Sequence, residues 1–292
     1  MPAIPRLSID HPRSVTTGAG PRRKRQSDHL SLPTISLLGV RLHAVSEAQT
    51  VWHVLDELDV DNGGWVVTHN TDHLRRLARD QSFATLCATA SLAVADGAPL
   101  VWASRLQRTP LPERVTGSNL ISSLSAGAAA RGRSIYLLGG TPGTAEAAKK
   151  VLQARHPALR IVGTRCPPMG FEHDLKQLAD LAEHVTNAAP DIVFVGLGSP
   201  KQERLIQKLR TNLPTAWWLG VGISFSFLCN EVKRAPRWVQ WAGFEWAHRL
   251  AREPRRLARR YLREGIPFTA QLLTAAAWQG LRAGGEREPV RD

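Results

Sequence analysis

The sequence predicts an α/β fold in which a largely parallel sheet carries helices on both of its faces. Short apolar segments alternate with segments of helical periodicity, and several of the apolar segments end in a glycine-rich turn. Strands that are buried on both faces give near-continuous apolar runs, and their alternation with helices is typical of parallel sheets. Such sheets bind ligands beyond the carboxyl ends of their strands. The polar residues that follow the strands are therefore the first candidates for a site.

The first third of the chain has the pattern of a strand pair, a helix, a strand and a second helix. Residues 35–45 are expected to form two strands. Residues 46–61 carry apolar side chains at helical spacing, and Ser46 is a suitable N-cap for that helix. Residues 63–70 give an apolar strand with a polar end, and a helix is expected over residues 71–90.

Three later segments repeat the order of strand, turn and helix. Residues 133–157 and 190–213 each contain an apolar strand, a glycine-rich turn and a helix, and residues 215–230 begin a third such unit. Residues 159–170 supply a further strand and a proline-rich loop. Strands that are joined by helical crossovers run parallel, so these units are expected to extend one sheet.

The composition is that of a globular protein with a large excess of positive charge. The chain has 292 residues, 43% of them hydrophobic and 22% charged, which suits one large domain or two modest ones. The net charge of +13 requires an acidic partner: nucleic acid, an anionic membrane surface or a phosphorylated substrate. Cys87, Cys166 and Cys229 have no CxxC spacing, which argues against a disulfide framework or a zinc site and favours a reducing compartment.

Composition also divides the chain into three parts. Residues 1–30 are basic, are expected to be disordered, and lack the apolar segment of a secretory signal. Residues 31–230 hold the α/β core, and residues 231–292 form a basic, tryptophan-rich and arginine-rich helical appendage with a flexible tail. A membrane-spanning helix needs roughly 18–20 apolar residues. Residues 266–281 come nearest to this length, but polar side chains interrupt them.

Glycine-rich turns are candidate binding loops. The turn 137–143, with Gly139 and Gly140, joins a strand to a helix start, where backbone N–H groups and the helix dipole would attract a phosphate. It lacks the GxGxxG pattern and the Lys-Ser/Thr pair of a P-loop, so a tight structural turn explains it equally well. Gly222, in the turn of the third unit, is a further candidate for substrate contact.

The segment 196–203 is more informative. Gly198 permits close approach of a ligand to the backbone, and Lys201, Gln202 and Glu203 follow at the expected start of a helix. A glutamate at a helix start often only complements the helix dipole. Three polar residues behind a glycine-rich loop, at the carboxyl end of a strand, nevertheless favour a substrate-binding site.

Two further segments at strand or helix ends carry polar candidates. Thr68 and Asn70 could offer a hydroxyl and an amide to a ligand, although capping of the next helix by Asn70 or Thr71 is the simpler role. In the segment 112–120, Arg114 could clamp a phosphate bidentately. A surface ion pair is the more frequent role of an arginine.

Asp96 follows the short apolar strand 91–95 and precedes turn residues. It could be a turn former, a helix cap or a reacting group, and its place among the other polar residues at strand ends favours the last. A carboxylate partly shielded from water can act there as a general base. Asp59 and Asp61 have the spacing of a DxD metal motif, but a surface turn explains them better, so no metal site is expected.

Residues 231–265 concentrate positive charge, with ten basic residues against four acidic ones and interleaved tryptophans. The arginines that recur along one side of a helix are Arg249, Arg252, Arg256, Arg259, Arg260 and Arg263, with Pro254 as the expected interruption. A basic amphipathic segment with tryptophans is typical of an element that lies on a membrane surface. A solvated charged face is the default alternative, and no nucleic-acid-binding motif accompanies the charge.

The chain resembles the WecG/TagA/CpsF glycosyltransferases, glycosyltransferase family 26, because seven motifs occur in the order seen in that family. The resemblance covers roughly residues 35–265. The motifs are THNTDHLRRLARD, ADGAPLVW, PERVTGSNL, YLLGGTPGTAEAA, GLGSPKQE, RAPRWVQWAGFEWAHRL and EPRRLARRYL.

The resemblance implies an inverting, metal-independent enzyme without a cofactor. Such enzymes move a sugar of ManNAc, ManNAc uronic acid or glucose type from a UDP-sugar to a polyprenyl-pyrophosphate-linked saccharide. They build bacterial cell-surface polysaccharides at the inner face of the cytoplasmic membrane, where they are peripheral. The implied fold is a Rossmann-like core with a C-terminal appendage that contributes to the active site and to membrane docking. The sequence does not distinguish a monomer from a homo-oligomer.

The resemblance also assigns roles to residues. Asp96 matches the family's proposed catalytic base. Thr68 and Asn70 match the polar pair of its TxN motif, and Thr68 is expected to be catalytic as well. Arg114 matches an arginine expected near the pyrophosphate, and Gln202 and Glu203 match the PKQE motif. The matches in the basic appendage are Arg234, Arg237 and the arginines after Glu253.

One departure from the family pattern concerns the third glycine-rich strand. Ser226 stands where Asp is common, and Asn230 stands where Gly is common. Because of this departure, the resemblance does not assign the donor sugar.

Two rival classes fit parts of the sequence. A nucleotide-dependent oxidoreductase would suit the α/β pattern, but the dinucleotide fingerprint is missing. A non-catalytic nucleic-acid-binding protein would suit the charge, but it would not account for the polar residues at the strand ends. The sequence therefore favours a transferase that does not bind nucleic acid.

Overall fold

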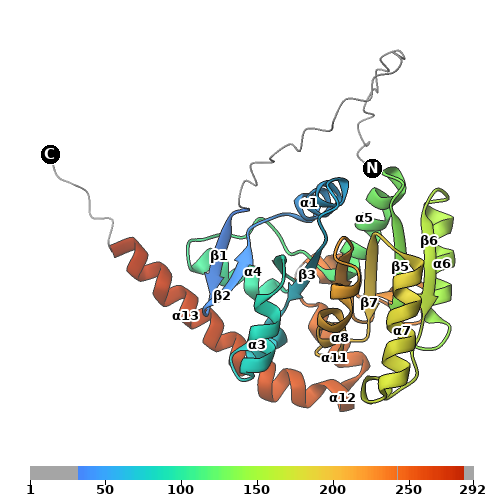
Figure 1. The fold of residues 1–292 in the computed structure, drawn as a ribbon. Helices are drawn as coiled ribbons and strands as arrows, with labels where there is room; N and C mark the ends of the chain where they lie inside the picture. The colour runs from blue at the N-terminus through green and yellow to red at the C-terminus, as the bar shows by residue number, and fades with distance from the viewer. Residues whose placement is uncertain (1–31, 242, 286–292) are drawn as a thin grey trace, which may run out of the picture. The chain divides into compact units, whose positions relative to one another are not determined.

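The computed structural model describes residues 32–241 and 243–285, and the predicted disorder of residues 1–30 lies outside these residues. Its centre is a six-stranded sheet in which all neighbouring strands pair in parallel (Figure 1). In spatial order the strands are β4 (Leu92–Ala95), β3 (Gly64–His69), β8 (Trp217–Gly220), β7 (Ile192–Gly196), β5 (Ser134–Gly139) and β6 (Arg160–Arg165). The predicted parallel sheet is confirmed.

Helices cover both faces of the sheet, as predicted. One apolar core unites the sheet with α1 (Glu47–Asp59), α5 (Gly117–Ala130), α6 (Thr144–Arg155) and α9 (Ser224–Leu228). The other core unites it with α3 (Gln81–Ala88), α7 (Leu175–Ala188) and α8 (Lys201–Leu209). Side chains alternate along each strand, so Val66 of β3 faces the first core while Val67 faces the second.

A short hairpin precedes the sheet. β1 (Thr34–Leu37) pairs antiparallel with β2 (Val40–His43), which confirms the predicted strand pair. Its two turn residues, Leu38 and Gly39, have φ values of +50° and +80°, as a tight hairpin turn requires. The Nδ1 atom of His43 accepts a hydrogen bond of 3.0 Å from the Ala93 N–H, so the hairpin is joined to β4.

The N-terminal helices follow their capping residues. Ser46 and Gln49 form a capping box at the start of α1, as the sequence indicates for Ser46. The single helix expected over residues 71–90 is instead two helices, α2 (Thr71–Leu77) and α3. The carboxylate of Asp80 accepts a hydrogen bond of 3.0 Å from the Phe83 N–H and starts α3 as a new helix.

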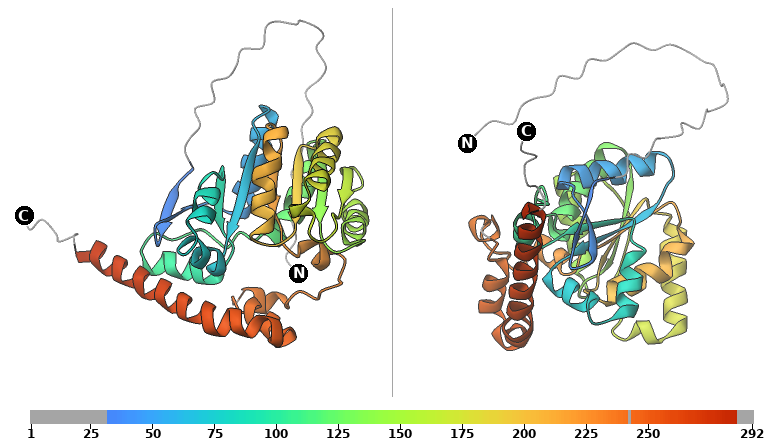
Figure 2. Two further views of the ribbon diagram at one scale, coloured as in Figure 1. Left: turned by 60° about the horizontal axis from the view of Figure 1, so that its bottom comes forward. Right: turned by 90° about the vertical axis from the view of Figure 1, so that its left-hand side faces the viewer.

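The C-terminal appendage is helical, as predicted. It comprises α10 (Arg237–Trp241), α11 (Glu245–Arg252), α12 (Pro254–Ala258), a π-helical turn (Arg259–Gly265) and α13 (Ile266–Gly285). α13 runs beside α4 (Ala98–Leu106), where Phe268 and Leu272 share a buried cluster with Leu100 (Figure 2). At Gly280 a Cβ atom would come within 2.1 Å of the Leu106 carbonyl oxygen, so the two helices touch through backbone. Among the helices of the described residues, none combines the length and apolarity needed to cross a bilayer.

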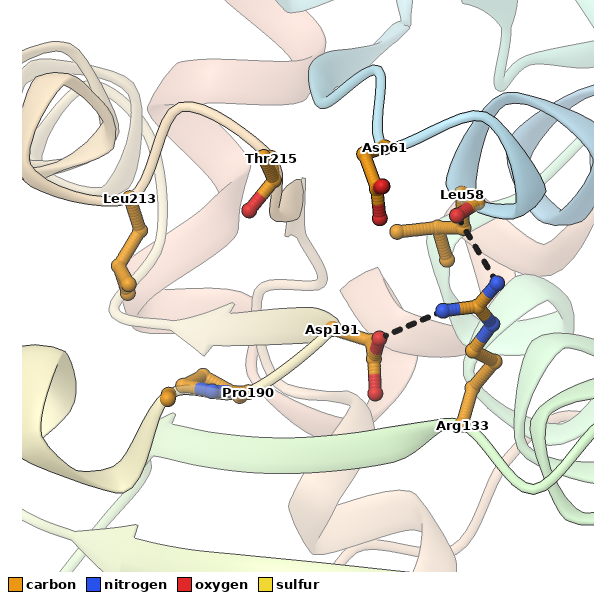
Figure 3. A pocket seen from close by; sticks show the side chains of 8 residues that line it. Leu58, Asp61, Arg133, Pro190, Asp191, Leu213 and Thr215 are labelled. Carbon is orange, nitrogen blue, oxygen red and sulfur yellow. Dashed lines mark hydrogen bonds and ion pairs between the residues drawn. The ribbon is translucent and has the colours of Figure 1, made fainter. Parts of the chain in front are cut away.

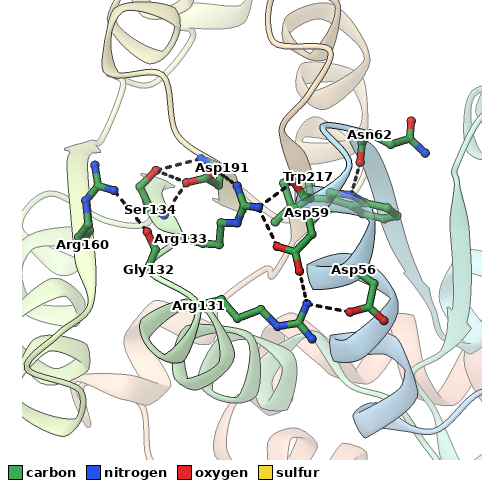
Figure 4. A network of polar contacts seen from close by, with 11 residues as sticks. Asp56, Asp59, Asn62, Arg131, Gly132, Arg133, Ser134, Arg160, Asp191 and Trp217 are labelled. Atoms are coloured by element: carbon green, nitrogen blue, oxygen red, sulfur yellow. Dashed lines mark hydrogen bonds and ion pairs between the residues drawn. The ribbon is translucent and has the colours of Figure 1, made fainter. Parts of the chain in front are cut away.

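A charged network ties the amino ends of β5 and β7 to α1 (Figure 4). The Asp191 carboxylate accepts hydrogen bonds from the Ser134 N–H and hydroxyl, both 2.7 Å, and from Arg133 at 3.1 Å. Arg133 also donates to Asp59 at 2.7 Å. Burial alone would raise the pKa of Asp191, but the hydrogen bonds from Ser134 and Arg133 outweigh it, and the pKa lies below its ordinary value.

A small pocket of about 90 Å³ lies beside this network (Figure 3). Its lining includes Asp61, Arg133, Pro190, Asp191 and Thr215. The pocket stands at the amino ends of the strands, whereas ligands of parallel sheets bind at the carboxyl ends. Asp59 is the last residue of α1 and Asp61 lies in the turn that follows, close to the surface turn that the sequence indicates.

Replacing the central acceptor of this network should destabilise the fold. In Asp191→Ala the Ser134 donors and Arg133 lose a shared acceptor, and a buried donor without a partner costs about 1–3 kcal/mol. We expect the free energy of unfolding in urea to fall by about 2 kcal/mol or more at pH 7. Because the pKa of Asp191 is lowered on folding, the difference from the native chain should shrink as pH falls below 3.8.

The matched control is Asp180→Ala. Asp180 accepts from Arg165 at 2.7 Å, but both side chains are largely exposed, and such pairs contribute about 0–1 kcal/mol. Equal loss of stability in the two variants would contradict the assigned role of Asp191.

Candidate active site

Main-chain hydrogen bonds bring the predicted polar residues to one edge of the sheet. His69 of β3 pairs with Ala95 of β4, and the Asp96 N–H then donates to the His69 carbonyl at 2.6 Å. The Val115 N–H donates to the Ala95 carbonyl at 2.8 Å, which fixes the segment that carries Arg114. Asp96 and Arg114 are thereby held beside the carboxyl end of β3.

Asp96 is the best-supported reacting group at this edge. α4 starts with Gly97 as its N-cap, so the Asp96 side chain does not cap that helix. Asp96 is partly exposed as a residue, and its carboxylate accepts a hydrogen bond from the Gly117 N–H at the start of α5. Burial raises the pKa of Asp96 to about 6, against the lowering effect of Arg114. The carboxylate is ionised at neutral pH yet basic enough to take a proton.

The appendage brings two charged side chains to Asp96. Glu245 of α11 pairs through Oε2 with Nη1 of Arg114 at 3.3 Å and through Oε1 with Nε of Arg234 at 3.2 Å. Arg234 also donates from Nη1 to the Asn119 side chain at 2.8 Å, and its buried Nη2 has no hydrogen-bond partner. Glu245 acts to raise the pKa of Asp96 and Arg234 acts to lower it.

Thr68 and Asn70 lie on the same edge. Thr68 is buried, and its hydroxyl oxygen stands 3.6 Å from the position that a Cβ atom would take on Gly117. The threonine is thus next to the helix start that donates to Asp96. The Asn70 side-chain oxygen accepts a hydrogen bond of 3.0 Å from the His73 N–H, which confirms that Asn70 caps α2.

His69 is an alternative candidate for the base at this edge. It is buried on the opposite side of β3 from Thr68, and burial, with His73 as a second cause, lowers the pKa of His69 to about 3. Its ring meets that of His73 edge-on at 5.7 Å between centroids. A buried imidazole of lowered pKa on the opposite side of β3 from Thr68 is a poorer candidate for the base than Asp96.

The turn after β5 carries the glycines of the phosphate loop that the sequence suggests. Gly139 and Gly140 have positive φ values of 103° and 82°, which glycine adopts readily. The carboxylate of Glu231 accepts a hydrogen bond of 3.1 Å from the hydroxyl of Thr144, the first residue of α6. It also accepts one of 3.0 Å from Ser226. A carboxylate of the chain itself therefore lies near the start of α6, and phosphate binding by Gly139 and Gly140 stays a prediction.

The family departure at position 230 has a backbone explanation. Asn230 has a φ of +60°, a conformation that suits glycine and that asparagine tolerates better than most residues. The turn can thus be kept although glycine is replaced. Ser226, the other departure, donates to Glu231 as described above.

The motif 196–203 supports the site from inside the protein. Gln202 and Glu203 are 6% and 2% exposed, so their side chains lie inside the protein. Gln202 accepts from the Gly222 N–H at 3.0 Å and donates to Glu203 at 2.9 Å. Gly222 lies in the turn after β8, with a φ of +56°. The motif therefore shapes that turn.

The other two candidates of this motif are more exposed. Lys201 forms an ion pair with Glu172 and has a half-exposed side chain. Gly198 has a φ of +73° and nothing within 4 Å of an added Cβ atom, so it leaves open space beside the backbone. Gly198 remains a predicted point of ligand approach.

The basic arginines do not share one continuous helix. α11 ends before Pro254, as predicted for that proline, and the chain then passes from α12 into the π-helical turn. Arg252, Arg259 and Arg263 are exposed, while Arg249 is partly buried. The side chains of Arg237, Arg256 and Arg260 lie outside the described part of the structure. Exposed apolar side chains accompany these arginines, namely Trp238, Phe244, Leu262 and Ile266.

Sequence reasoning missed three residues of this edge: Glu245, Asn119 and Glu231. From the sequence, Glu245 is only one of four acidic residues in a basic segment. Its isolation among arginines and tryptophans was the signal available. Its partner Arg114 lies 131 positions away, a separation that no local pattern reports.

The described residues show no candidate metal site. Within residues 32–285, position 242 apart, no group of three or more His, Cys, Asp or Glu side chains could hold a metal ion. The expected independence from metals and cofactors stays a prediction.

Comparison with known proteins agrees with the resemblance seen in the sequence. The family model described as the glycosyl transferase WecG/TagA/CpsF family matches residues 35–282. An N-acetylglucosaminyldiphosphoundecaprenol N-acetyl-beta-D-mannosaminyltransferase of Bacillus subtilis is 28% identical over 202 residues, covering 69% of this chain and 77% of the relative. The enzyme of the same name from Bacillus spizizenii is 29% identical, covering 69% and 76%.

Removing the Gln202 side chain should loosen the turn after β8. Gln202→Ala leaves the Gly222 N–H without its acceptor and opens space in a buried region, so we expect the free energy of unfolding to fall by roughly 2 kcal/mol. Amide hydrogen exchange should accelerate at Gly222. Lys201→Ala, a neighbouring change on the exposed side, should alter the stability by less than about 1 kcal/mol. An unchanged exchange rate at Gly222 in Gln202→Ala would contradict the supporting role.

Proposed function

The chain belongs to the glycosyltransferase WecG/TagA/CpsF family, and we propose that it transfers a sugar from a UDP-sugar to a polyprenyl-diphosphate-linked acceptor. Among donor sugars of ManNAc, ManNAc uronic acid and glucose type, the names of the two Bacillus relatives favour ManNAc. The same names favour an acceptor that carries GlcNAc. The product belongs to a cell-surface polysaccharide.

One observation carries the proposal: Asp96 is a carboxylate of raised pKa held beside two arginines at the carboxyl edge of the sheet. A base of pKa about 6 is ionised at pH 7 and remains able to accept a proton in the transition state. The neighbouring cations provide positive charge for a diphosphate. Base and diphosphate-binding groups are the two parts that a sugar transfer from a nucleotide donor needs.

The proposed reaction is a single displacement. Asp96 takes the proton from the acceptor hydroxyl, and the hydroxyl oxygen forms a bond to C1 of the donor sugar. The bond between C1 and the oxygen of the β-phosphate breaks, and UDP leaves with that electron pair. Attack opposite to the leaving group inverts the configuration at C1. Thr68 holds the acceptor hydroxyl at Asp96, since its own hydroxyl lies beside the same helix start.

Arginines offset the charge that develops on UDP. The side chains of Arg114 and Arg234 are 21% and 22% exposed, and the buried Nη2 atom of Arg234 has no hydrogen-bond partner. Guanidinium groups bind phosphate oxygens through charge-assisted hydrogen bonds, which stabilise a departing diphosphate. Arg237, at the start of α10, is three positions beyond Arg234 and is proposed to contribute to the same charge.

The appendage is proposed to lie on the cytoplasmic face of the membrane, where a polyprenyl acceptor resides. Arg252, Arg259 and Arg263 are exposed on the appendage, which also exposes the apolar side chains of Trp238 and Leu262. Basic and apolar side chains together favour an anionic lipid surface. The same appendage supplies Arg234 and Glu245 to the site, so membrane contact and catalysis share one element.

The first test of this function is sugar transfer itself. The full chain, incubated with UDP-ManNAc and a GlcNAc-diphosphoprenol acceptor, should yield a disaccharide lipid identified by mass. In Asp96→Asn the rate should fall by roughly 10²–10⁴-fold, the usual contribution of a general base. For the native chain, kcat/KM should decline as pH falls below about 6, because protonation of Asp96 removes the base.

Asp96→Asn keeps the shape of the side chain, so its thermal unfolding should remain close to that of the native chain. Asp72→Asn, a change on α2 beyond the Asn70 cap, is the matched control and should keep most activity. Near-native turnover in folded Asp96→Asn would refute the proposed mechanism.

Removing exposed arginines should weaken membrane binding. Changing Arg252, Arg259 and Arg263 to Gln should reduce binding to phosphatidylglycerol vesicles by roughly 100-fold, since each basic residue near an anionic surface contributes about 1 kcal/mol. The control changes three exposed cations of the core to Gln, namely Lys150, Arg155 and Arg160. Vesicle co-sedimentation at rising salt measures both variants. Equal loss in the two variants would mean that net charge, and not the appendage, governs binding.

A further inference from the structure

Glu245 lies within a motif of the appendage, but the sequence gives it no role. Each of its carboxylate oxygens pairs with a different arginine, Oε2 with Arg114 at 3.3 Å and Oε1 with Arg234 at 3.2 Å. Arg114 comes from the loop before α5, whereas Arg234 precedes α10. Only 16% of the Glu245 side chain is exposed, so the three charges interact away from bulk water.

We propose that Glu245 is a positioning residue that holds the core arginine Arg114 and the appendage arginine Arg234 together beside Asp96. This inference rests on the proposed function for its meaning in catalysis. Two guanidinium groups that share one location repel each other, and a carboxylate between them removes that repulsion. The Nη1 atom of Arg234 donates to the Asn119 side chain of α5 at 2.8 Å, so the guanidinium that pairs with Glu245 has a fixed orientation.

Glu245 also sets the charge that Asp96 experiences. The groups that act on the Asp96 carboxylate are Arg114 and Arg234, the Gly117 N–H of α5, and Glu245. The two arginines and the N–H lower the pKa of Asp96, whereas burial and Glu245 raise it. Without Glu245, no carboxylate would offset the lowering effect of Arg114 and Arg234 on the pKa of Asp96. Asp96 would then be a weaker base at the pH where the enzyme works.

The consequence is a link between appendage docking and base strength. α11 carries Glu245, so the carboxylate reaches the core arginine Arg114 only when the appendage lies against the core. Docking therefore brings Arg234 for the diphosphate and, in the same step, the negative charge that keeps Asp96 basic. A membrane-facing element thereby influences proton transfer at the acceptor.

The test measures the titration of Asp96 in the full chain and does not depend on substrate. With ¹³C-labelled aspartate, the carboxyl signal that disappears in Asp96→Asn identifies Asp96. In Glu245→Gln the pKa of Asp96 should fall by roughly half a unit to one unit, less than the 1–3 units of a directly adjacent charge. In Arg234→Gln it should rise, since a cation is removed. In Glu245→Asp, which keeps the charge, the titration should stay near that of the native chain.

Glu264→Gln is the matched control. Glu264 pairs with Arg75 at 2.8 Å and is another appendage carboxylate bound to the core, but it is not among the groups that act on Asp96. Its loss should leave the Asp96 titration unchanged. A general loosening of the appendage would move the Asp96 titration in Glu264→Gln and Glu245→Gln alike.

The activity assay completes the test. In Glu245→Gln, kcat/KM should fall roughly 10- to 100-fold, as expected for a misplaced binding group, and the acid limb of its pH profile should move to lower pH. Glu245→Asp should recover most of the rate. If the native chain transfers no sugar, the proposed function fails while the titration still decides the role of Glu245.

Opposite shifts in Glu245→Gln and Arg234→Gln support the inference. Shifts in the same direction, or none in either variant, overturn it. Should Glu245→Gln fail to fold, the required rise in Arg234→Gln still decides the matter, because a structural defect alone gives no reason for that sign.

Discussion

The site depends on the way in which the parallel pairing of β3 and β4 continues past the strand ends. The hydrogen bond from the Asp96 N–H to the His69 carbonyl extends the ladder by one residue, and that from Val115 to Ala95 adds the segment of Arg114. Backbone bonds thus place a carboxylate and a cation from two loops at one edge. Side chains that alternate across β3 send Thr68 toward α5 and His69 into the opposite layer.

Charge balance at this edge explains how Asp96 can be partly buried and still ionise. A carboxylate taken out of water needs positive charge or hydrogen-bond donors to remain charged. Arg114, Arg234 and the Gly117 N–H provide them, and Glu245 prevents their combined effect from making Asp96 a weak base. Burial raises the pKa of Asp96 most strongly, and its balance with these groups gives a pKa of about 6. The appendage is therefore part of the electrostatics of the site as well as part of its wall.

The sequence predicts the sheet, its parallel strands and the place of Asp96, because each depends on local pattern. Apolar runs and turn residues identify strands regardless of what packs on them. The roles of Gln202 and Glu203 could not be predicted in this way, since their burial depends on how α8 lies against β8. The pairing of Arg114 with Glu245 likewise depends on where the appendage docks. Asn70 shows that a capping preference, which is local, can be predicted correctly.

Two places at the carboxyl edge can attract an anion, and the structure distinguishes them. The first place is the start of α6, since a helix N-terminus carries partial positive charge. There the Glu231 carboxylate already accepts from Thr144 and Ser226, so the positive end of the helix meets an anion of the chain itself. At the other place, Arg114 and Arg234 share one carboxylate between two positive charges. Arg234 also retains a buried donor atom without a hydrogen-bond partner. The proposed diphosphate site at Arg114 and Arg234 therefore has a free donor and lies beside the proposed base, whereas at the start of α6 a carboxylate of the chain already takes the hydroxyl donors.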